Sequence, residues 1–250
     1  MSNLNEHVYF GLARLTAVDL AATLAAVHEG GGDRLDTCAF ANGDQLLSEF
    51  QTPWAMVTTK LPVNVGLNAR RAVTQAVANR SVVRVLVHWP TPLLKFTWTE
   101  LLRSVDRGVV HEVGVCNLSP RLFASVVNIG RPVVHQFESS PLGVNQRMVD
   151  LALEHSVRPQ AWSPFGGPGA PVLRNEVVVN LAREYECSPA QVVVAWNLQR
   201  GVDVVVQATS VEHVRSVLTP VTLAEVDVAK LSAEDRGWTS DPMTVDYYNL

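Results

Sequence analysis

The sequence has few cysteines, few charged side chains and no long apolar run. Its three cysteines, Cys38, Cys116 and Cys187, are too few and too widely spaced for a disulfide framework or a zinc site. Charged residues make up 18% of the 250 residues, against a usual share of about 25%. So small a share suits a fold whose central layer is covered on all sides, and we therefore expect a large buried core.

The sequence also lacks the features of proteins that bind nucleic acids or enter membranes. The net charge is −4, and no basic run or aromatic-plus-basic stripe occurs, so we expect no nucleic acid partner. Every apolar run is shorter than the ~20 residues that span a bilayer. The first ten residues have neither the basic nor the apolar region of a signal peptide. We therefore expect a soluble, cytoplasmic protein with no membrane partner and no bound metal.

What the sequence does have is a regular alternation of two patterns. Short apolar runs typical of strands lie at 7–12, 34–38, 55–60, 82–88, 110–117, 132–138, 158–162 and 203–208. Helix-period segments lie between them, at 16–28, 66–80, 96–108, 119–130, 145–155 and 188–201. Valine-rich strands separated by amphipathic helices indicate a parallel sheet with helices outside it.

Eight such units in 250 residues match the size of a closed barrel. No linker or composition shift divides the chain, so we predict an α/β fold in which residues 1–250 form a single (β/α)8 TIM barrel. The alternative is an open doubly wound sheet, which usually carries a glycine-rich phosphate turn after its first strand. The residues there, GLAR at 11–14, form no such turn, which favours the barrel.

Polar side chains occur where the predicted strands end. In a barrel, the C-terminal ends of the strands assemble the active site. Taken singly, each polar residue has an ordinary structural explanation, such as a loop cap or a buried histidine. Because these ends meet at one mouth, together they predict a polar pocket. In chain order they are Asp36, Lys60, His88, Asn117, Gln136 with Glu138, Trp162 with Ser163, and Gln207.

Six short motifs carry a resemblance to a known family. They are LDTC, VTTK, LVHWP, GVCN, VHQFE and QAWSPFG, which follow one another between residues 35 and 166. In order and spacing they resemble the aldo-keto reductase superfamily, over about residues 8–234. The resemblance implies a barrel whose N-terminal hairpin is missing or shortened in this chain. It also implies that residues 235–250 form a C-terminal tail near the barrel mouth.

The resemblance implies carbonyl reduction with a nicotinamide cofactor, carried out by an Asp, Tyr, Lys and His tetrad. Asp36, Lys60 and His88 match three of its members. The tyrosine should stand five residues after the aspartate, where this chain has Ala41. None of the residues AFANG at 39–43 can exchange a proton. Because the loss of a general acid typically costs about 10²- to 10⁴-fold in rate, we expect weak or altered chemistry.

Two replacements for the missing proton donor suggest themselves. His88 is one, since histidine has an unperturbed pKa near 6.5 and changes its charge near neutral pH. The other is a tyrosine of the tail, Tyr247 or Tyr248, which would have to reach the mouth.

The resemblance implies NADP(H) or NAD(H) as cofactor, bound weakly if at all. Two amides, Asn117 and Gln136, would hold the nicotinamide carboxamide, and Trp162 would stack on the ring. Cys116, where the family usually has serine, and Ser163 complete this end of the expected site.

After the eighth strand, the family presents a lysine and then an arginine to the adenosine phosphate. This chain has QATS at 207–210, then His213, and Val217 at a position where a polar adenine contact is usual. Two lost charge-assisted hydrogen bonds, at roughly 1.5–3 kcal/mol each, would weaken NADPH by about 10²- to 10⁴-fold. NADH, which lacks that phosphate, would suffer less.

Aromatic residues near the mouth suggest an apolar or aromatic small-molecule substrate. The residues concerned are Trp54, Trp89, Phe165 and the tail tyrosines Tyr247 and Tyr248. Two other functions stay open. The first is a non-redox enzyme, an isomerase, lyase or cyclase, that uses Lys60, His88 and Asp36. The second is a non-catalytic descendant that binds a ligand.

Overall fold

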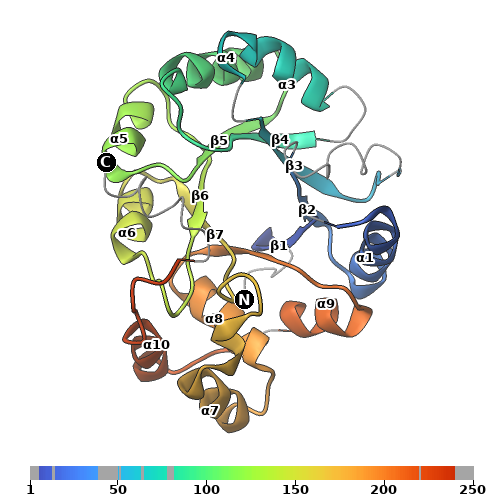
Figure 1. Cartoon of the computed structure of the whole chain (residues 1–250), viewed down its shortest axis with the longest axis vertical. Coiled ribbons are helices and arrows are strands. Elements are labelled where there is room, and N and C mark those ends of the chain that lie inside the picture. The colour runs from blue at the N-terminus through green and yellow to red at the C-terminus, as the bar shows by residue number, and fades with distance from the viewer. Residues whose placement is uncertain are drawn as a thin grey trace.

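A computed structural model of the chain describes residues 6–12, 15–38, 50, 52–62, 65–77, 82–219 and 221–239. Eight parallel strands close into a barrel in chain order, with helices around it (Figure 1). The strands are β1 (Val8–Gly11), β2 (Arg34–Asp36), β3 (Met56–Leu61), β4 (Val82–Val87), β5 (Glu112–Cys116), β6 (Val134–Glu138), β7 (Arg158–Trp162) and β8 (Asp203–Val206). The predicted (β/α)8 barrel is confirmed.

All six predicted helical segments contain a helix. These helices are α1 (Ala17–Gly30), α3 (Ala69–Val77), α4 (Leu94–Asp106), α5 (Pro120–Val127), α6 (Gln146–Glu154) and α8 (Pro189–Gln199). The sequence patterns do not predict α7 (Glu176–Glu184), α9 (Val211–Leu218) and α10 (Glu225–Ser232), each of which has only eight or nine residues. Two 3-10 turns, η3 (Gly66–Asn68) and η4 (Pro171–Arg174), complete the described elements.

Serine caps start three of the helices close to the barrel mouth. Ser119 accepts from Leu122 N–H and is followed by proline at the first helical position of α5. Ser188 begins α8 with a reciprocal capping box to Gln191. Ser210 begins α9, and its side chain accepts from His213 N–H. These caps fix where the loops after the strands turn into helices, and therefore where loop side chains point.

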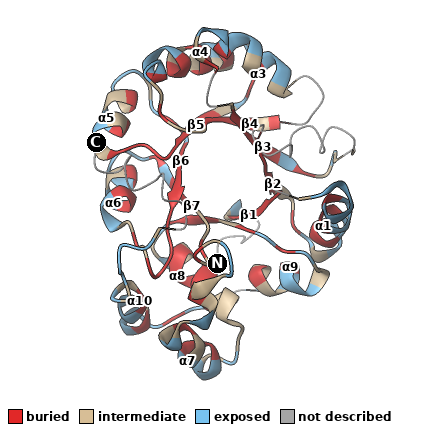
Figure 2. Ribbon diagram, in the orientation of Figure 1, coloured by how far each residue is buried: buried red, intermediate tan, exposed pale blue. Residues whose placement is uncertain are grey.

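The core has an inner and an outer layer because strand side chains alternate in direction. Outward-facing apolar side chains of the strands pack under the helices, so that every strand is largely buried while the helices keep an exposed face (Figure 2). Inside the barrel, Leu86, Cys116 and Val134 form a small cluster of their own. A third cluster joins α7, α8 and α10 outside the barrel.

Charged groups close the N-terminal end of the barrel, opposite the mouth. Arg84 donates to Glu112 Oε2 over 2.8 Å and to the hydroxyl of Tyr9 over 3.0 Å. His7 and Asp203 pair at 2.8 Å. Ion pairs at this end serve stability, because catalysis in such barrels belongs to the other end. Five of the seven residues before β1 lie outside the described residues, so the missing or shortened hairpin stays a prediction.

The described part of the tail, 235–239, crosses the loops at the mouth side of β6 and β7. The backbone N–H groups of Arg236 and Trp238 both donate to Leu142 O. The indole of Trp238 donates to Gly166 O over 3.3 Å. None of the helices in the described part of the chain has the length and apolarity needed to cross a membrane.

Candidate active site

A cavity of about 1140 Å³ opens at the C-terminal ends of the strands. A cavity of this size is large enough for a cofactor together with a small substrate. The structure brings together the predicted strand ends as lining residues, apart from Glu138: Asp36, Lys60, His88, Asn117, Gln136, Trp162, Ser163 and Gln207, together with Trp89.

Three residues expected near the site do not line the cavity. Cys116 belongs to the inner cluster with Leu86 and Val134, and burial raises the pKa of its thiol. Glu138 is buried and accepts a hydrogen bond from Thr239 Oγ1 at 2.5 Å. Trp54 precedes β3 and therefore belongs to the other end of the barrel, where it stacks on His28 with ring centroids 4.6 Å apart. The expectation that Trp54 lies near the mouth is wrong.

A buried ion pair forms the floor of the cavity. The ammonium of Lys60 pairs with Asp36 Oδ1 and also donates to Thr37 O over 3.1 Å. Both side chains of the pair are only 7% exposed. Burial, the largest single effect, lowers the pKa of Lys60, but the charge of Asp36, the nearby thiols of Cys116 and Cys38 and the hydrogen bond to Asp36 together outweigh it, and the pKa is raised. Lys60 is therefore charged, and of its three N–H donors one is left for a ligand.

His88 stands beside this pair as a neutral group. Burial, and then the positive charge of Lys60, lower the pKa of His88 to about 3. Its Nδ1 has no hydrogen-bond partner among the described residues. A histidine with so low a pKa carries no extra proton near neutral pH. This argues against the expectation that His88 replaces the missing tyrosine as proton donor.

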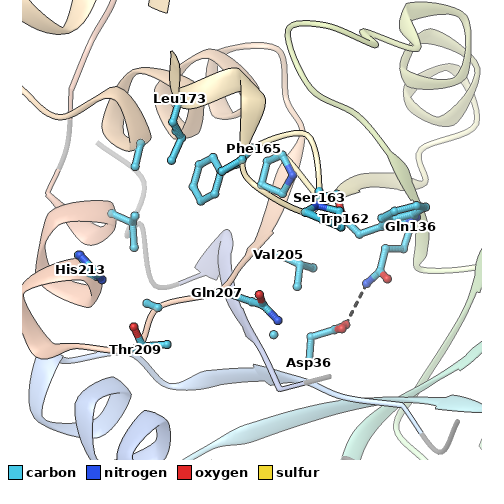
Figure 3. A pocket seen from close by; sticks show the side chains of 18 of the residues that line it. Asp36, Gln136, Trp162, Ser163, Phe165, Leu173, Val205, Gln207, Thr209 and His213 are labelled. Carbon is cyan, nitrogen blue, oxygen red and sulfur yellow. Dashed lines mark hydrogen bonds between the residues drawn. The ribbon is translucent and has the colours of Figure 1, made fainter. Parts of the chain in front are cut away.

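Two amides, Asn117 and Gln136, and the indole of Trp162 line the cavity. Figure 3 shows Gln136 and Trp162 next to each other. Asn117 adopts a left-handed backbone conformation, with φ of 56°, which asparagine tolerates better than most residues. Its Oδ1 accepts from the indole of Trp162 over 2.8 Å, and its Nδ2 donates to His88 O over 3.2 Å. Gln136 Nε2 donates to Asp36 Oδ2 over 2.9 Å. Gln136 is therefore joined to the ion pair, whereas Asn117 is joined to Trp162 and to the backbone of His88.

His135 is a supporting residue that the sequence analysis missed. It lies on the outer face of β6, is fully buried, and its Nε2 accepts the backbone N–H of Leu118 at 3.1 Å. That hydrogen bond holds the turn that follows Asn117. Burial lowers the pKa of His135 to about 3, so the ring accepts this bond as a neutral imidazole.

Lowering the pH from 7 to 5 is expected to cost about 2 kcal/mol of unfolding free energy through His135 alone. The folded-state pKa is about 3 and the unfolded value about 6.5, so only the unfolded chain gains a proton in this window. Stability is therefore full above about pH 6.5 and falls by about 1.4 kcal/mol per unit below it. Urea unfolding of the natural chain and of His135→Gln checks this. An equal loss in both proteins would contradict it.

The other end of the cavity lies between α8 and α9. Figure 3 shows His213 and Thr209 here, away from Asp36 and Gln136. Among the described residues that line this end, none is a lysine or an arginine: Ser188, Pro189, Ala190, Gln207, Ala208, Thr209, His213, Ser216 and Val217. The hydroxyls of Ser188 and Ser216 are 3.0 Å apart.

The nearest arginine of α9 turns away from this end of the cavity. Arg215 is absent from the lining residues, and its Nη2 donates to Glu29 O in α1 over 3.4 Å. Glu212, in the first turn of α9, adds a negative charge nearby. This end therefore offers hydroxyls and an imidazole, with no permanent positive charge among the described lining residues.

Three positions of the sequence analysis cannot be placed. Ala41 and the tail tyrosines Tyr247 and Tyr248 lie outside the described residues. The statement that Ala41 replaces a tyrosine therefore rests on the sequence alone.

Comparison with known proteins gives a consistent result. The model of the aldo/keto reductase family matches residues 20–234. The methylglyoxal reductase DkgA of Yersinia pestis is 28% identical over 207 residues, which cover 80% of this chain and 71% of that protein. A 9,11-endoperoxide prostaglandin H2 reductase of Trypanosoma cruzi is 35% identical over 132 residues, covering 50% of this chain and 46% of that protein.

Solved structures share the fold. An aldo-keto reductase of Bombyx mori, in complex with NADP, superposes with a TM-score of 0.86 at 18% identity, covering 96% of this chain and 94% of that one. The aldose reductase of Schistosoma japonicum has the same TM-score at 19% identity, covering 96% and 92%. At such identities the likeness shows the barrel and no more.

Proposed function

The chain belongs to the aldo-keto reductase family, and we propose that it reduces the carbonyl group of a small molecule with a nicotinamide cofactor, slowly and with a preference for NADH. One observation carries the proposal. A charged ammonium, Lys60 held by Asp36, lies at the floor of a cavity whose lining also offers two amides and an indole.

The amide side of the cavity fits a nicotinamide carboxamide, which needs one acceptor and one donor. Gln136 Oε1 has no partner among the described residues, so it is available to accept an N–H. Asn117 Nδ2 gives one proton to His88 O and keeps a second to donate. The indole of Trp162 provides a flat surface beside them. These three side chains can bind a flat, uncharged amide by hydrogen bonds and stacking, with no charged protein group.

A reduced nicotinamide supplies a hydride to the carbonyl carbon when it is bound. The remaining steps belong to the chain. The free N–H of Lys60 binds the carbonyl oxygen and stabilises the negative charge that develops on it. Lys60 then gives this oxygen a proton and recovers one from water. Asp36 keeps the ammonium oriented, and His88 offers a neutral hydrogen-bonding group.

The raised pKa of Lys60 makes this reaction slow. A lysine held charged by Asp36 is a weaker acid than a phenol would be in the same place. Since Ala41 stands where the family has its tyrosine, we propose that Lys60 is the proton donor, at a cost of about 10²- to 10⁴-fold in rate.

The preference for NADH follows from the end of the cavity between α8 and α9. A phosphate ester dianion bound there would be desolvated at a cost in free energy. No lysine or arginine among the described lining residues of this end would offset that cost with an ion pair. The hydroxyls of Ser188 and Ser216 suit the hydroxyls of an unphosphorylated ribose. NADPH should therefore bind more weakly than NADH.

The substrate is proposed to be an aldehyde with an apolar or aromatic group. Trp89, Phe165 and Leu173 are the large apolar side chains of the lining. Relatives named methylglyoxal reductase and aldehyde reductase also point to aldehydes.

We also propose that the chain forms one barrel domain and works in the cytoplasm. The structure places none of Cys38, Cys116 and Cys187 in a disulfide. Cysteines outside disulfides are usual in a reducing compartment.

The non-redox alternative is less well supported. Use of Lys60 as an amine nucleophile requires a lowered pKa, whereas its pKa is raised. A non-catalytic role does not explain the buried pair of Lys60 and Asp36. Apolar residues would fill the same space without the cost of desolvating two charges.

Titration with NADH and with NADPH, followed by quenching of tryptophan fluorescence, tests the cofactor site. We expect saturation at micromolar NADH and at least roughly tenfold weaker binding of NADPH. Trp162→Phe should remove most of the quenching. The matched control is Trp98→Phe, because Trp98 is fully buried in α4 and lies outside the cavity lining. No saturable quenching by either cofactor at millimolar concentration would overturn the proposal, and tighter binding of NADPH would overturn the preference.

A further inference from the structure

A fully buried glutamine lies directly behind the amide side of the cavity. Gln160 is in the middle of β7, is 0% exposed, and does not line the cavity. It is the register partner of Gln136 on the neighbouring strand β6. Its Oε1 accepts a hydrogen bond from Gln136 Nε2 at 2.7 Å. Gln160 therefore touches the residue that meets a ligand, without meeting a ligand itself.

This contact uses the second proton of the Gln136 amide. One proton of Nε2 goes to Asp36 Oδ2 over 2.9 Å and the other to Gln160 Oε1. With both protons engaged, the oxygen Oε1 is the only part of this amide left for a ligand. Rotating the amide by half a turn would place its oxygen against the carboxylate of Asp36, and it would exchange the hydrogen bond to Gln160 Oε1 for a contact between two carbonyl oxygens unless Gln160 rotated too. The carboxylate of Asp36 therefore opposes the other orientation.

Packing alone does not account for a glutamine at this position. Gln160 Nε2 is buried and has no hydrogen-bond partner among the described residues. A buried donor without a partner is unfavourable, and a methionine would fill the same space without one. The inner cluster nearby, Leu86, Cys116 and Val134, shows that the barrel interior accepts apolar side chains.

We propose that Gln160 is a positioning residue, which fixes the Gln136 amide with its nitrogen toward Asp36 and its oxygen toward the cavity. Asp36 alone holds one proton, and the amide would swing about that single bond. Gln160 supplies the second point that fixes the plane. The site then selects a ligand that presents an N–H at this place, such as a carboxamide, over one that presents a ketone. The identity of the ligand rests on the proposed function, whereas the orientation of the amide does not.

The orientation is tested first on the protein without any ligand. In the natural chain, we expect both side-chain amide protons of Gln136, assigned by their loss in Gln136→Glu, to be protected from exchange with water. In Gln160→Met, one of them should exchange at least about tenfold faster, because its acceptor is gone. Val134→Ala is the matched control, since it alters a fully buried interior side chain of β6 outside the amide network and should change neither proton. Unchanged protection in Gln160→Met would overturn the proposal.

Selectivity is tested next with two dinucleotides. The probes are NAD⁺ and its 3-acetylpyridine analogue, in which a methyl ketone replaces the carboxamide and no N–H remains. We expect the natural chain and Val134→Ala to prefer NAD⁺ by roughly fivefold, the worth of one hydrogen bond. In Gln160→Met the two should bind almost equally. A ratio that stays the same in Gln160→Met would overturn the selective role.

The two measurements separate this proposal from the proposed function. If neither dinucleotide binds the natural chain, the nicotinamide site is wrong. The exchange of the Gln136 protons still decides whether Gln160 orients that amide. If the dinucleotides bind but the exchange is unaffected by Gln160→Met, the cofactor site stands and the role of Gln160 falls.

Discussion

Replacing Lys60 by methionine is expected to lower the free energy of unfolding by about 3–5 kcal/mol and to abolish carbonyl reduction. The substitution leaves the carboxylate of Asp36, which is 7% exposed, without its counter-charge. Among the described residues, Gln136 alone then donates to it, through one hydrogen bond of 2.9 Å. Urea unfolding measures the first effect. The second is the rate of aldehyde reduction, which should fall by more than about 10³-fold because the charged donor is gone.

A double variant separates the structural role of Lys60 from its chemical role. Adding Asp36→Asn to Lys60→Met removes the uncompensated charge, so most of the lost stability should return. Activity should not return, because no ammonium remains to stabilise the developing oxyanion. A double variant as unstable as Lys60→Met would show that the charge of Asp36 is not the cause of the loss. Substantial reduction by Lys60→Met would show that Lys60 is not the group that binds the carbonyl oxygen.

Introducing a tyrosine at position 41 should raise the rate of reduction by about 10²- to 10⁴-fold. The ammonium of Lys60 is held charged by Asp36, and a nearby positive charge lowers the pKa of a phenol. Ala41→Tyr would thus supply a better acid than Lys60 itself. The measurement is the single-turnover rate with NADH and an aldehyde.

Ala41→Phe is the control for this gain, since it adds the same ring without the hydroxyl. If both variants gave the same rate, or neither exceeded the natural chain, the site would not be limited by a missing general acid. That outcome would favour a repurposed or non-catalytic barrel over a weakened reductase.

The barrel could be predicted because its signals are local and repeated. Most strands are short apolar runs that contain valine, and several helices show a regular apolar repeat that begins after a cap such as Ser119 or Ser188. Length does not explain the missed helices α7, α9 and α10, because the predicted helices α3, α5 and α6 are equally short. The alternation of strands and helices does not call for them, since α7 precedes a second helix between the same two strands and α9 and α10 follow the last strand.

The site was predictable wherever a polar residue ends a strand. The parallel ends of a barrel must meet, so Asp36, Lys60 and Gln136 could be brought together from the sequence. Gln160 and His135 could not. Like Gln136 they lie inside strands, but the family resemblance gives them no role in the site. Whether such a residue faces the barrel interior or the helices depends on strand register. The low pKa of His88 was equally hidden, since it comes from burial and a charge brought close by folding.

The most direct test of the reductase account follows deuterium from cofactor to product. The natural chain is mixed with benzaldehyde and NADH deuterated at the transferred position, and the benzyl alcohol formed is examined by mass spectrometry. The account predicts slow formation of alcohol with one deuterium on the former carbonyl carbon, and none with Lys60→Met. Saturating binding of NADH with no deuterated alcohol, from either the natural chain or Ala41→Tyr, would contradict it.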